Sequence, residues 1–168
     1  MLAVQNTLRA STVNSAVTLF VLCGFFHFAQ YAARSAPRVM IPELSQILDL
    51  AKAAMGALIG SYYYTYSLSS VVAGGLLDKF GARAPVAVGM LMFAAGCTMF
   101  ASAGYGVALA GRLLQGCGAA FAFTGAVYIA TQNFAPARLA SAIGIVQAFG
   151  MLWGARSMSN MTTPTMSA

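Results

Sequence analysis

Two groups of polar side chains lie within stretches of the sequence that are otherwise strongly apolar. Members of the first group are spaced by three or four residues, which places them on one face of a helix. A polar face on a membrane helix must look into protein or into a water-filled cavity, because lipid cannot satisfy it. This group consists of His27, Gln30, Tyr31 and Arg34.

Two kinds of chemistry are available to this first group. His27 titrates near neutral pH, so it can either exchange a proton or serve as a hydrogen-bonded structural residue. The guanidinium of Arg34 can bind a carboxylate or a phosphate through two parallel hydrogen bonds. The alternative for Arg34, and more so for Arg38, is an interfacial position from which a long cationic side chain reaches the lipid headgroups.

The second group, Arg112 with Gln115, lies in a later apolar stretch. An arginine near the centre of a membrane helix costs about 2.5–3.5 kcal/mol on insertion scales. No Asp or Glu lies within any apolar stretch to pair with Arg112, so its partner should be a carbonyl, a tyrosine hydroxyl, a ligand or a group elsewhere. We expect Arg112 to face the inside of a helix bundle, with Tyr63 and Tyr66 as further candidates for lining the same cavity.

The composition requires a membrane environment for these groups. Of the 168 residues, 60% are hydrophobic and only 7% are charged, whereas a soluble domain carries about 25% charged residues. The net charge of +6 comes from scattered Lys and Arg, without the basic run typical of nucleic-acid binding. No nucleophile, phosphate-binding or metal-ligand motif occurs, so we expect no enzyme activity, no cofactor, no metal site and no nucleic-acid partner.

The apolar stretches predict an all-α fold, a polytopic transmembrane helix bundle with about five spans. For the first stretch, a cleaved signal peptide with Arg9 as its basic region is the alternative. Residues 1–12 are expected to form an N-terminal segment and residues 156–168 a disordered tail. Residues 34–52 are expected to form a long polar connection, and a short interfacial helix is one alternative for residues 43–50. The predicted spans are about residues 13–33, 53–77, 84–104, 107–130 and 139–155.

Small residues recur on one face of the second and fourth predicted spans. Small side chains let the backbones of membrane helices approach closely, so each face is expected to pack against another helix. The second-span face consists of Gly56, Gly60, Tyr63, Ser67, Ser70 and Gly74, and the fourth-span face of Gly111, Gly118 and Gly125.

The turn between the second and third predicted spans reads Gly-Gly-Leu-Leu-Asp-Lys-Phe-Gly-Ala-Arg over residues 74–83. It resembles the signature Gly-x-Leu-x-Asp-Arg/Lys-x-Gly-Arg/Lys-Arg/Lys of the major facilitator superfamily, except at Ala82, where that family has a base. Residues 112–120, Arg-x-x-Gln-Gly-x-Gly-Ala-Ala, look like the family's second signature, and residues 37–44 are similar to the loop after the first span in some bacterial members. The signature positions in the turn are Gly74, Leu76, Asp78, Lys79, Gly81 and Arg83.

The resemblance implies a secondary transporter that works by alternating access between two six-helix halves. It covers about residues 13–154, the first five of twelve spans. We therefore expect a truncated N-terminal half that is inactive alone, whose natural packing partner is the missing C-terminal half. In the family, the position of Asp78 and the neighbouring bases latch the cytoplasmic side, and the position of Arg112 is associated with proton coupling or substrate binding. Ala82 puts the full strength of that latch in doubt.

The resemblance also implies a location and partners. It places the signature turn and the N-terminus in the cytoplasm, with the chain in the lipid bilayer of a bacterial inner membrane. The number of cations alone does not decide this orientation, because the predicted spans place four Lys and Arg residues on one side of the membrane and three on the other. The solute would be small, with an anion as one candidate, and a proton is the candidate coupling ion. The alternative is a small non-transporting membrane protein that acts as a helix-associating subunit or regulator.

Overall fold

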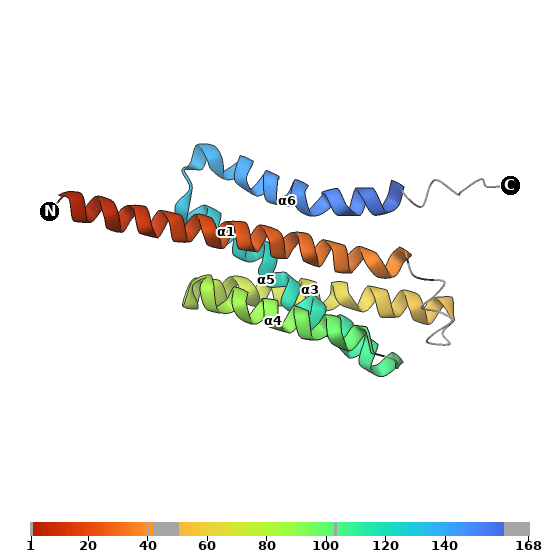
Figure 1. Ribbon diagram of the computed structural model, residues 1–168. Coiled ribbons are helices and arrows are strands. Elements are labelled where there is room, and N and C mark those ends of the chain that lie inside the picture. The colour runs from red at the N-terminus through yellow and green to blue at the C-terminus, as the bar shows by residue number, and fades with distance from the viewer. Residues whose placement is uncertain (1, 40, 42–50, 103, 160–168) are drawn as a thin grey trace.

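The computed structural model describes residues 2–39, 41, 51–102 and 104–159, and this part of the chain is built from α-helices without a strand. The predicted all-α class is therefore confirmed. Helix α5 crosses obliquely behind α1, with α6 on one side and the α3–α4 pair on the other, and contacts all four (Figure 1). The helices are α1 (Leu2–Val39), α3 (Lys52–Phe80), α4 (Arg83–Phe100), α5 (Tyr105–Asn133) and α6 (Pro136–Ser159).

Local sequence explains where the helices stop and start near the predicted turns. Gly81 ends α3 with φ 73°, a left-handed conformation that glycine adopts without a steric penalty, and its N–H donates to the carbonyl of Leu77 at 2.9 Å. Pro136 is the first residue of α6, where its fixed φ suits the helix and its missing N–H is not needed.

Several helices run past the predicted spans. Helix α1 begins at Leu2 and continues to Val39, so at 1.5 Å per residue it is about 57 Å long, well beyond the bilayer core. Residues 34–39, the first part of the polar connection expected over 34–52, are helical. Pro37 lies inside the helix near its end, where it removes only one backbone hydrogen bond. Helix α6 also extends to Ser159, into the predicted tail. The predicted interfacial helix over 43–50 and the tail over 160–168 lie outside the described residues.

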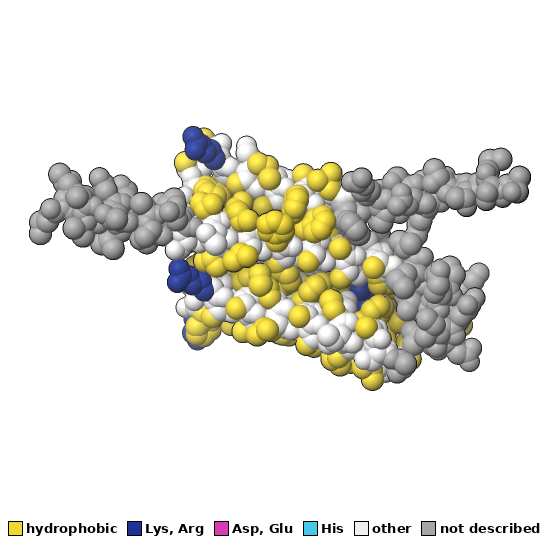
Figure 2. Space-filling view, viewed as in Figure 1, with side chains coloured by type: hydrophobic (Ala, Val, Ile, Leu, Met, Phe, Trp, Pro, Cys, Tyr) yellow, Lys and Arg dark blue, Asp and Glu magenta, His cyan; other side chains and the backbone are white. Residues whose placement is uncertain are grey.

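The outside of the bundle is apolar, unlike the surface of a water-soluble protein, and small residues line much of the buried surface of α5. Tyr64 and Val71 on α3 are 81% and 78% exposed, whereas the alanines at 119, 120 and 122 on α5 are fully buried. Figure 2 shows hydrophobic side chains over the middle of the visible face. Among the described residues, α4 and α5 are long and apolar enough to cross a membrane, and α6 carries a shorter apolar stretch over Pro136–Leu152.

Glycines bring α5 very close to its neighbours, as predicted for the fourth-span face. A Cβ atom on Gly111 would lie 2.6 Å from the backbone nitrogen of Phe100, and one on Gly118 would meet the carbonyl of Gly89. On the α4 side, a Cβ on Gly96 would lie 2.7 Å from the carbonyl of Gly111. The α4–α5 contact is therefore a backbone-to-backbone approach that larger residues would block.

Within the described part of the chain, the glycines of the second-span face contact no other helix. Cβ atoms built on Gly56, Gly60 or Gly74 meet nothing within 4 Å. Helix α3 instead meets α5 on a neighbouring face, where Gly116 of α5 lies directly against the backbone of Tyr62. A regular spacing of small residues shows that a face could pack closely, but not which of several faces is covered.

Candidate functional site

Two residues of each predicted polar group are buried in the bundle. His27 and Gln30 on α1 and Arg112 and Gln115 on α5 are each at most 2% exposed. The expectation that Arg112 faces the inside of the bundle is confirmed, since its side chain is fully buried. Polar groups at such depth require hydrogen-bond partners, and these partners define the site.

A continuous chain of hydrogen bonds passes through the first group and joins three helices. The hydroxyl of Tyr62 on α3 donates to Oε1 of Gln30 at 2.7 Å, and Nε2 of Gln30 lies 3.1 Å from Nδ1 of His27. On the other side of the ring, Nε2 of His27 lies 3.1 Å from Oε1 of Gln147 on α6. Nε2 of Gln147 then donates to the hydroxyl of Tyr31 at 3.2 Å. This polar chain, Tyr62–Gln30–His27–Gln147–Tyr31, links α3, α1 and α6.

The approach of α6 to His27 depends on Gly150. A Cβ atom at this position would lie 2.7 Å from Cδ2 and 3.0 Å from Nε2 of His27, and 3.0 Å from Cδ2 of Tyr31. The imidazole also contacts the ring of Tyr31 at a centroid distance of 4.9 Å and the ring of Phe123 on α5 at 5.2 Å. The histidine is therefore fixed on several sides, and Gly150 supplies the space on the α6 side.

Arg112 is held by oxygen atoms and by aromatic faces from earlier helices. Its Nη1 donates to Oε1 of Gln115 at 2.8 Å, and Gln115 in turn donates to the carbonyl of Gly96 on α4 at 3.2 Å. The guanidinium carbon lies 5.2 Å from the ring centroids of both Tyr62 and Phe100. These contacts stabilise a cation inside an apolar bundle through hydrogen bonds and ring quadrupoles.

Pro37 supplies one further acceptor for Arg112. A proline has no N–H, so the carbonyl four residues earlier, that of Ala33, lacks its helical donor. Nη1 of Arg112 lies 3.5 Å from this carbonyl oxygen. Pro37 is therefore a buried helical residue beside the site. Among the partners foreseen for Arg112, the structure provides a carbonyl and adds a glutamine amide and two rings.

Tyr62 connects the two predicted groups, since its hydroxyl binds Gln30 and its ring packs against Arg112. The sequence prediction missed Tyr62 and Gln147, naming Tyr63 and Tyr66 from the same tyrosine-rich segment. Gln147 carried the signal used elsewhere, an amide inside an apolar stretch. Nothing in the sequence distinguished Tyr62 from its neighbours, because a run of consecutive tyrosines on a helix points in several directions.

The remaining predicted cavity residues lie around this core and are half-buried. The guanidinium carbon of Arg34 lies 3.9 Å above the ring of Tyr31 and 5.8 Å from that of Tyr63. Tyr66 stacks on Tyr62 with ring centroids 5.9 Å apart. The structure thus brings all eight predicted cavity residues into one region of the bundle, with Tyr62 and Gln147 as additions.

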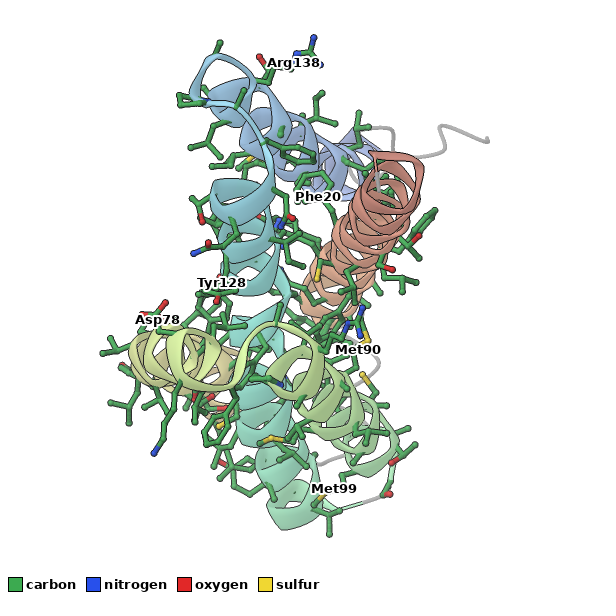
Figure 3. The ribbon with its side chains drawn as sticks, turned by 90° about the vertical axis from the view of Figure 1, so that its left-hand side faces the viewer. Phe20, Asp78, Met90, Met99, Tyr128 and Arg138 are labelled. Carbon is green, nitrogen blue, oxygen red and sulfur yellow. The ribbon has the colours of Figure 1, made fainter. Side chains whose placement is uncertain are left out.

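The predicted gating turn is separate from the buried site. Asp78, Lys79 and Arg83 are exposed, and Nζ of Lys79 lies 5.4 Å from the ring of Phe80. The connection from α3 to α4 and the connection from α5 to α6 lie at the end of the bundle that also holds the N-terminus (Figure 1), and the labelled Asp78 and Arg138 both project outward in Figure 3. Basic side chains gather at this end of the visible surface (Figure 2).

Comparison with known proteins agrees with the resemblance of the sequence motifs to the major facilitator superfamily. The family model for the Major Facilitator Superfamily matches residues 19–155. The chain is 22% identical over 117 residues to the methylenomycin A resistance protein of Bacillus subtilis (strain 168), covering 69% of this chain and 25% of that protein. It is 33% identical over 97 residues to the probable vesicular acetylcholine transporter-B of Danio rerio, covering 56% of this chain and 20% of that protein. The chain therefore spans about a quarter or less of these curated relatives.

Proposed function

The chain belongs to the major facilitator superfamily, and from this premise we propose that it forms part of a secondary transporter that moves a small anionic solute together with protons. Membership of this family makes it an integral membrane protein of transporter type. The solute class, the coupling ion and the assembly are the proposal, and each is supported by particular residues.

The complete burial of Arg112 is the main observation that supports an anionic solute. A fixed cation inside the bundle, held by a glutamine amide, a backbone carbonyl and two aromatic rings, favours the binding of a carboxylate or phosphate. Arg34 adds a second, half-buried cation in the same region. Asp78 is the one acidic residue that the structure describes, and it lies in an exposed turn away from the bundle interior.

His27 supports the choice of a proton as the coupling ion. It is buried, it lies in the polar chain between α3 and α6, and imidazole is the side chain whose ordinary pKa lies nearest to neutral pH. A proton bound at His27 would add positive charge to the region in which an anion binds. Proton and anion would therefore favour one another electrostatically, which is the requirement for symport.

The open face of α3 supports an assembly with further membrane helices. Gly56, Gly60 and Gly74 have no neighbour within 4 Å of a Cβ position, and Leu68 and Val71 on α3 are largely exposed. In a complete carrier this face would pack against the second half of the transporter. The exposed turn with Asp78, Lys79 and Arg83 would then serve as one side of a cytoplasmic latch, in a bacterial inner membrane with the N-terminus inside.

The same open face favours a second candidate function, that of a helix-associating subunit or regulator of another carrier. In that case the small residues of α3 would bind a partner helix and the buried polar groups would be structural. Solute binding separates the two candidates, because a purely associating subunit has no requirement for a binding site.

The test is equilibrium binding to the purified chain in lipid nanodiscs, with radiolabelled phosphate, acetate, succinate and benzoate as probes. We expect saturable binding of at least one probe that falls at least tenfold in Arg112→Gln and is unchanged in the exposed control Arg138→Gln. Absence of saturable binding to all four probes, or equal binding by the wild type and Arg112→Gln, contradicts the proposal.

A further inference from the structure

The hydrogen bonds around His27 have a fixed direction. Oε1 of Gln147 can only accept, so the imidazole donates to it from Nε2. The amide nitrogen of Gln30 can only donate, so Nδ1 of His27 accepts from it. Oε1 of Gln30 then accepts the hydrogen of the Tyr62 hydroxyl. Neutral His27 with its proton on Nε2 satisfies all three bonds, and the other neutral tautomer does not.

Protonation of His27 is incompatible with this arrangement. A proton on Nδ1 would face the amide NH₂ of Gln30 across 3.1 Å, with a donor on each side. Half a turn of the terminal amide exchanges its oxygen and nitrogen, which have nearly the same size, so no helix has to move. Oε1 of Gln30 then accepts from Nδ1, and its Nε2 donates to the oxygen of Tyr62. The hydroxyl hydrogen of Tyr62 must turn away from Gln30.

We propose that Gln30 is an amide switch that transmits the protonation of His27 to Tyr62, and that the released Tyr62 hydroxyl becomes a hydrogen-bond donor for an anion beside Arg112. One proton from the aqueous phase binds Nδ1, and no proton leaves the chain. The ring of Tyr62 is the one that Arg112 packs against, at 5.2 Å. The use of the switch for anion binding rests on the proposed function, whereas the switch itself does not.

The surroundings of the ring identify His27 as the group that responds to pH. Each helix packed against α1 contributes a neighbour to this region, and the ionisable groups among these neighbours are tyrosines and arginines. No acidic side chain is among these neighbours. They are Tyr31 and Arg34 on α1, Tyr62 on α3 through Gln30, Phe93 on α4 through its contact with Phe26, Phe123 and Arg112 on α5, and Gln147 on α6.

The chain is well suited to a direct test because it contains a single histidine. The full chain would be labelled with ¹⁵N-histidine and ¹³Cζ-tyrosine, placed in lipid nanodiscs without solute and titrated by NMR. All imidazole signals then report on His27, and the tyrosine signal absent from Tyr62→Phe is that of Tyr62. We expect the Nε2–H tautomer at high pH and a shift of the Tyr62 signal that follows the His27 titration. A dominant Nδ1–H tautomer, or a Tyr62 signal that ignores the titration, overturns the switch.

Three variants locate the switch at Gln30. In Gln30→Met, His27 should still titrate while the Tyr62 signal no longer follows it. In Gln147→Met, which cuts the polar chain on the other side of the ring, the Tyr62 response should persist, as it should in the exposed control Gln132→Met. Retention of the response in Gln30→Met, or its loss in Gln147→Met, contradicts the proposal. Because no solute is present in the NMR experiment, its result on the switch does not depend on the outcome of the anion-binding experiment.

Discussion

At the scale of single residues, the site depends on space as much as on polar chemistry. Gly150 on α6 lies where any side chain would touch both His27 and Tyr31. The polar chain can reach Gln147 only because this position lacks a Cβ atom. A small residue three positions from a glutamine is therefore part of the site, although it makes no polar contact itself.

Replacing Gly150 with alanine should separate α6 from α1. The new Cβ would lie 2.7 Å from the imidazole, which is too close without a shift of the helix. We expect a loss of roughly 1–3 kcal/mol of stability, typical of overpacking, in unfolding by sodium dodecyl sulfate in mixed micelles. The matched control is Gly144→Ala on the same helix, where nothing lies within 4 Å of the new atom. Equal stability of the two variants would refute the assigned role of Gly150.

Pro37 and Arg112 should be energetically coupled. Pro37→Ala restores an N–H that competes with Arg112 for the carbonyl of Ala33, 3.5 Å from Nη1. In a double-mutant cycle with Arg112→Leu, we expect the two changes to be non-additive by about 0.5–1 kcal/mol. Unfolding in mixed micelles measures all four corners of the cycle. Strict additivity would mean that the Ala33 carbonyl contributes nothing to holding Arg112.

At the scale of the helices, the contacts of α5 are far less tolerant of substitution than the open face of α3. Gly118→Ala would press a Cβ against the α4 backbone at Gly89 and Phe93, which cannot yield without separating the two helices. We expect a loss of about 1–3 kcal/mol in stability. Gly60→Ala on α3, where nothing lies within 4 Å, should be neutral or slightly stabilising. A stability loss for Gly60→Ala in a monomeric sample would place a neighbour on that face.

The end of α3 should be sensitive to the conformation of Gly81 rather than to its contacts. Its φ of 73° costs an alanine about 1–2 kcal/mol, although nothing lies within 4 Å of the added atom. Gly75→Ala is the matched control, because Gly75 is helical and equally uncrowded. Urea or detergent unfolding that ranks Gly75→Ala below Gly81→Ala in stability would contradict this reading of the turn.

The helices and the site were predictable to different degrees from the sequence. Apolar stretches identify the part of a helix that lipid surrounds, but α1 shows that the helical backbone continues through polar residues beyond it. His27, Gln30, Arg112 and Gln115 could be identified because they are polar residues within apolar stretches. Burying such residues costs much free energy in any fold. Tyr62 could not be singled out, since its role depends on how α3 is rotated against α1 and α5.

At the scale of the whole molecule, cation counting does not decide the orientation, so the proposed orientation rests on the family resemblance of the turn between α3 and α4. The α3–α4 and α5–α6 connections share one end with the N-terminus (Figure 1). These connections carry Lys79, Arg83 and Arg138, and the proposed function places this end in the cytoplasm.

Labelling from one side of the membrane tests the proposed orientation. In a background with the three native cysteines replaced by alanine, single cysteines would be introduced at the exposed positions Ala137 and Ser102, in the α5–α6 and α4–α5 regions respectively. A membrane-impermeant maleimide should modify Ala137→Cys only from the cytoplasmic side and Ser102→Cys only from the opposite side. The reverse pattern would invert the proposed topology.

The surroundings of Arg112 also bear on how the chain is made. Its described contacts outside α5 are with Ala33 of α1, Tyr62 of α3 and Phe100 of α4, all of which leave the ribosome before α5 does. A charged helix that enters the bilayer after α1, α3 and α4 can meet acceptors and rings that are already in place, so its arginine is not left exposed to lipid. The order of the helices along the chain therefore allows an assembly in which Arg112 enters the bilayer after Ala33, Tyr62 and Phe100, which contact it.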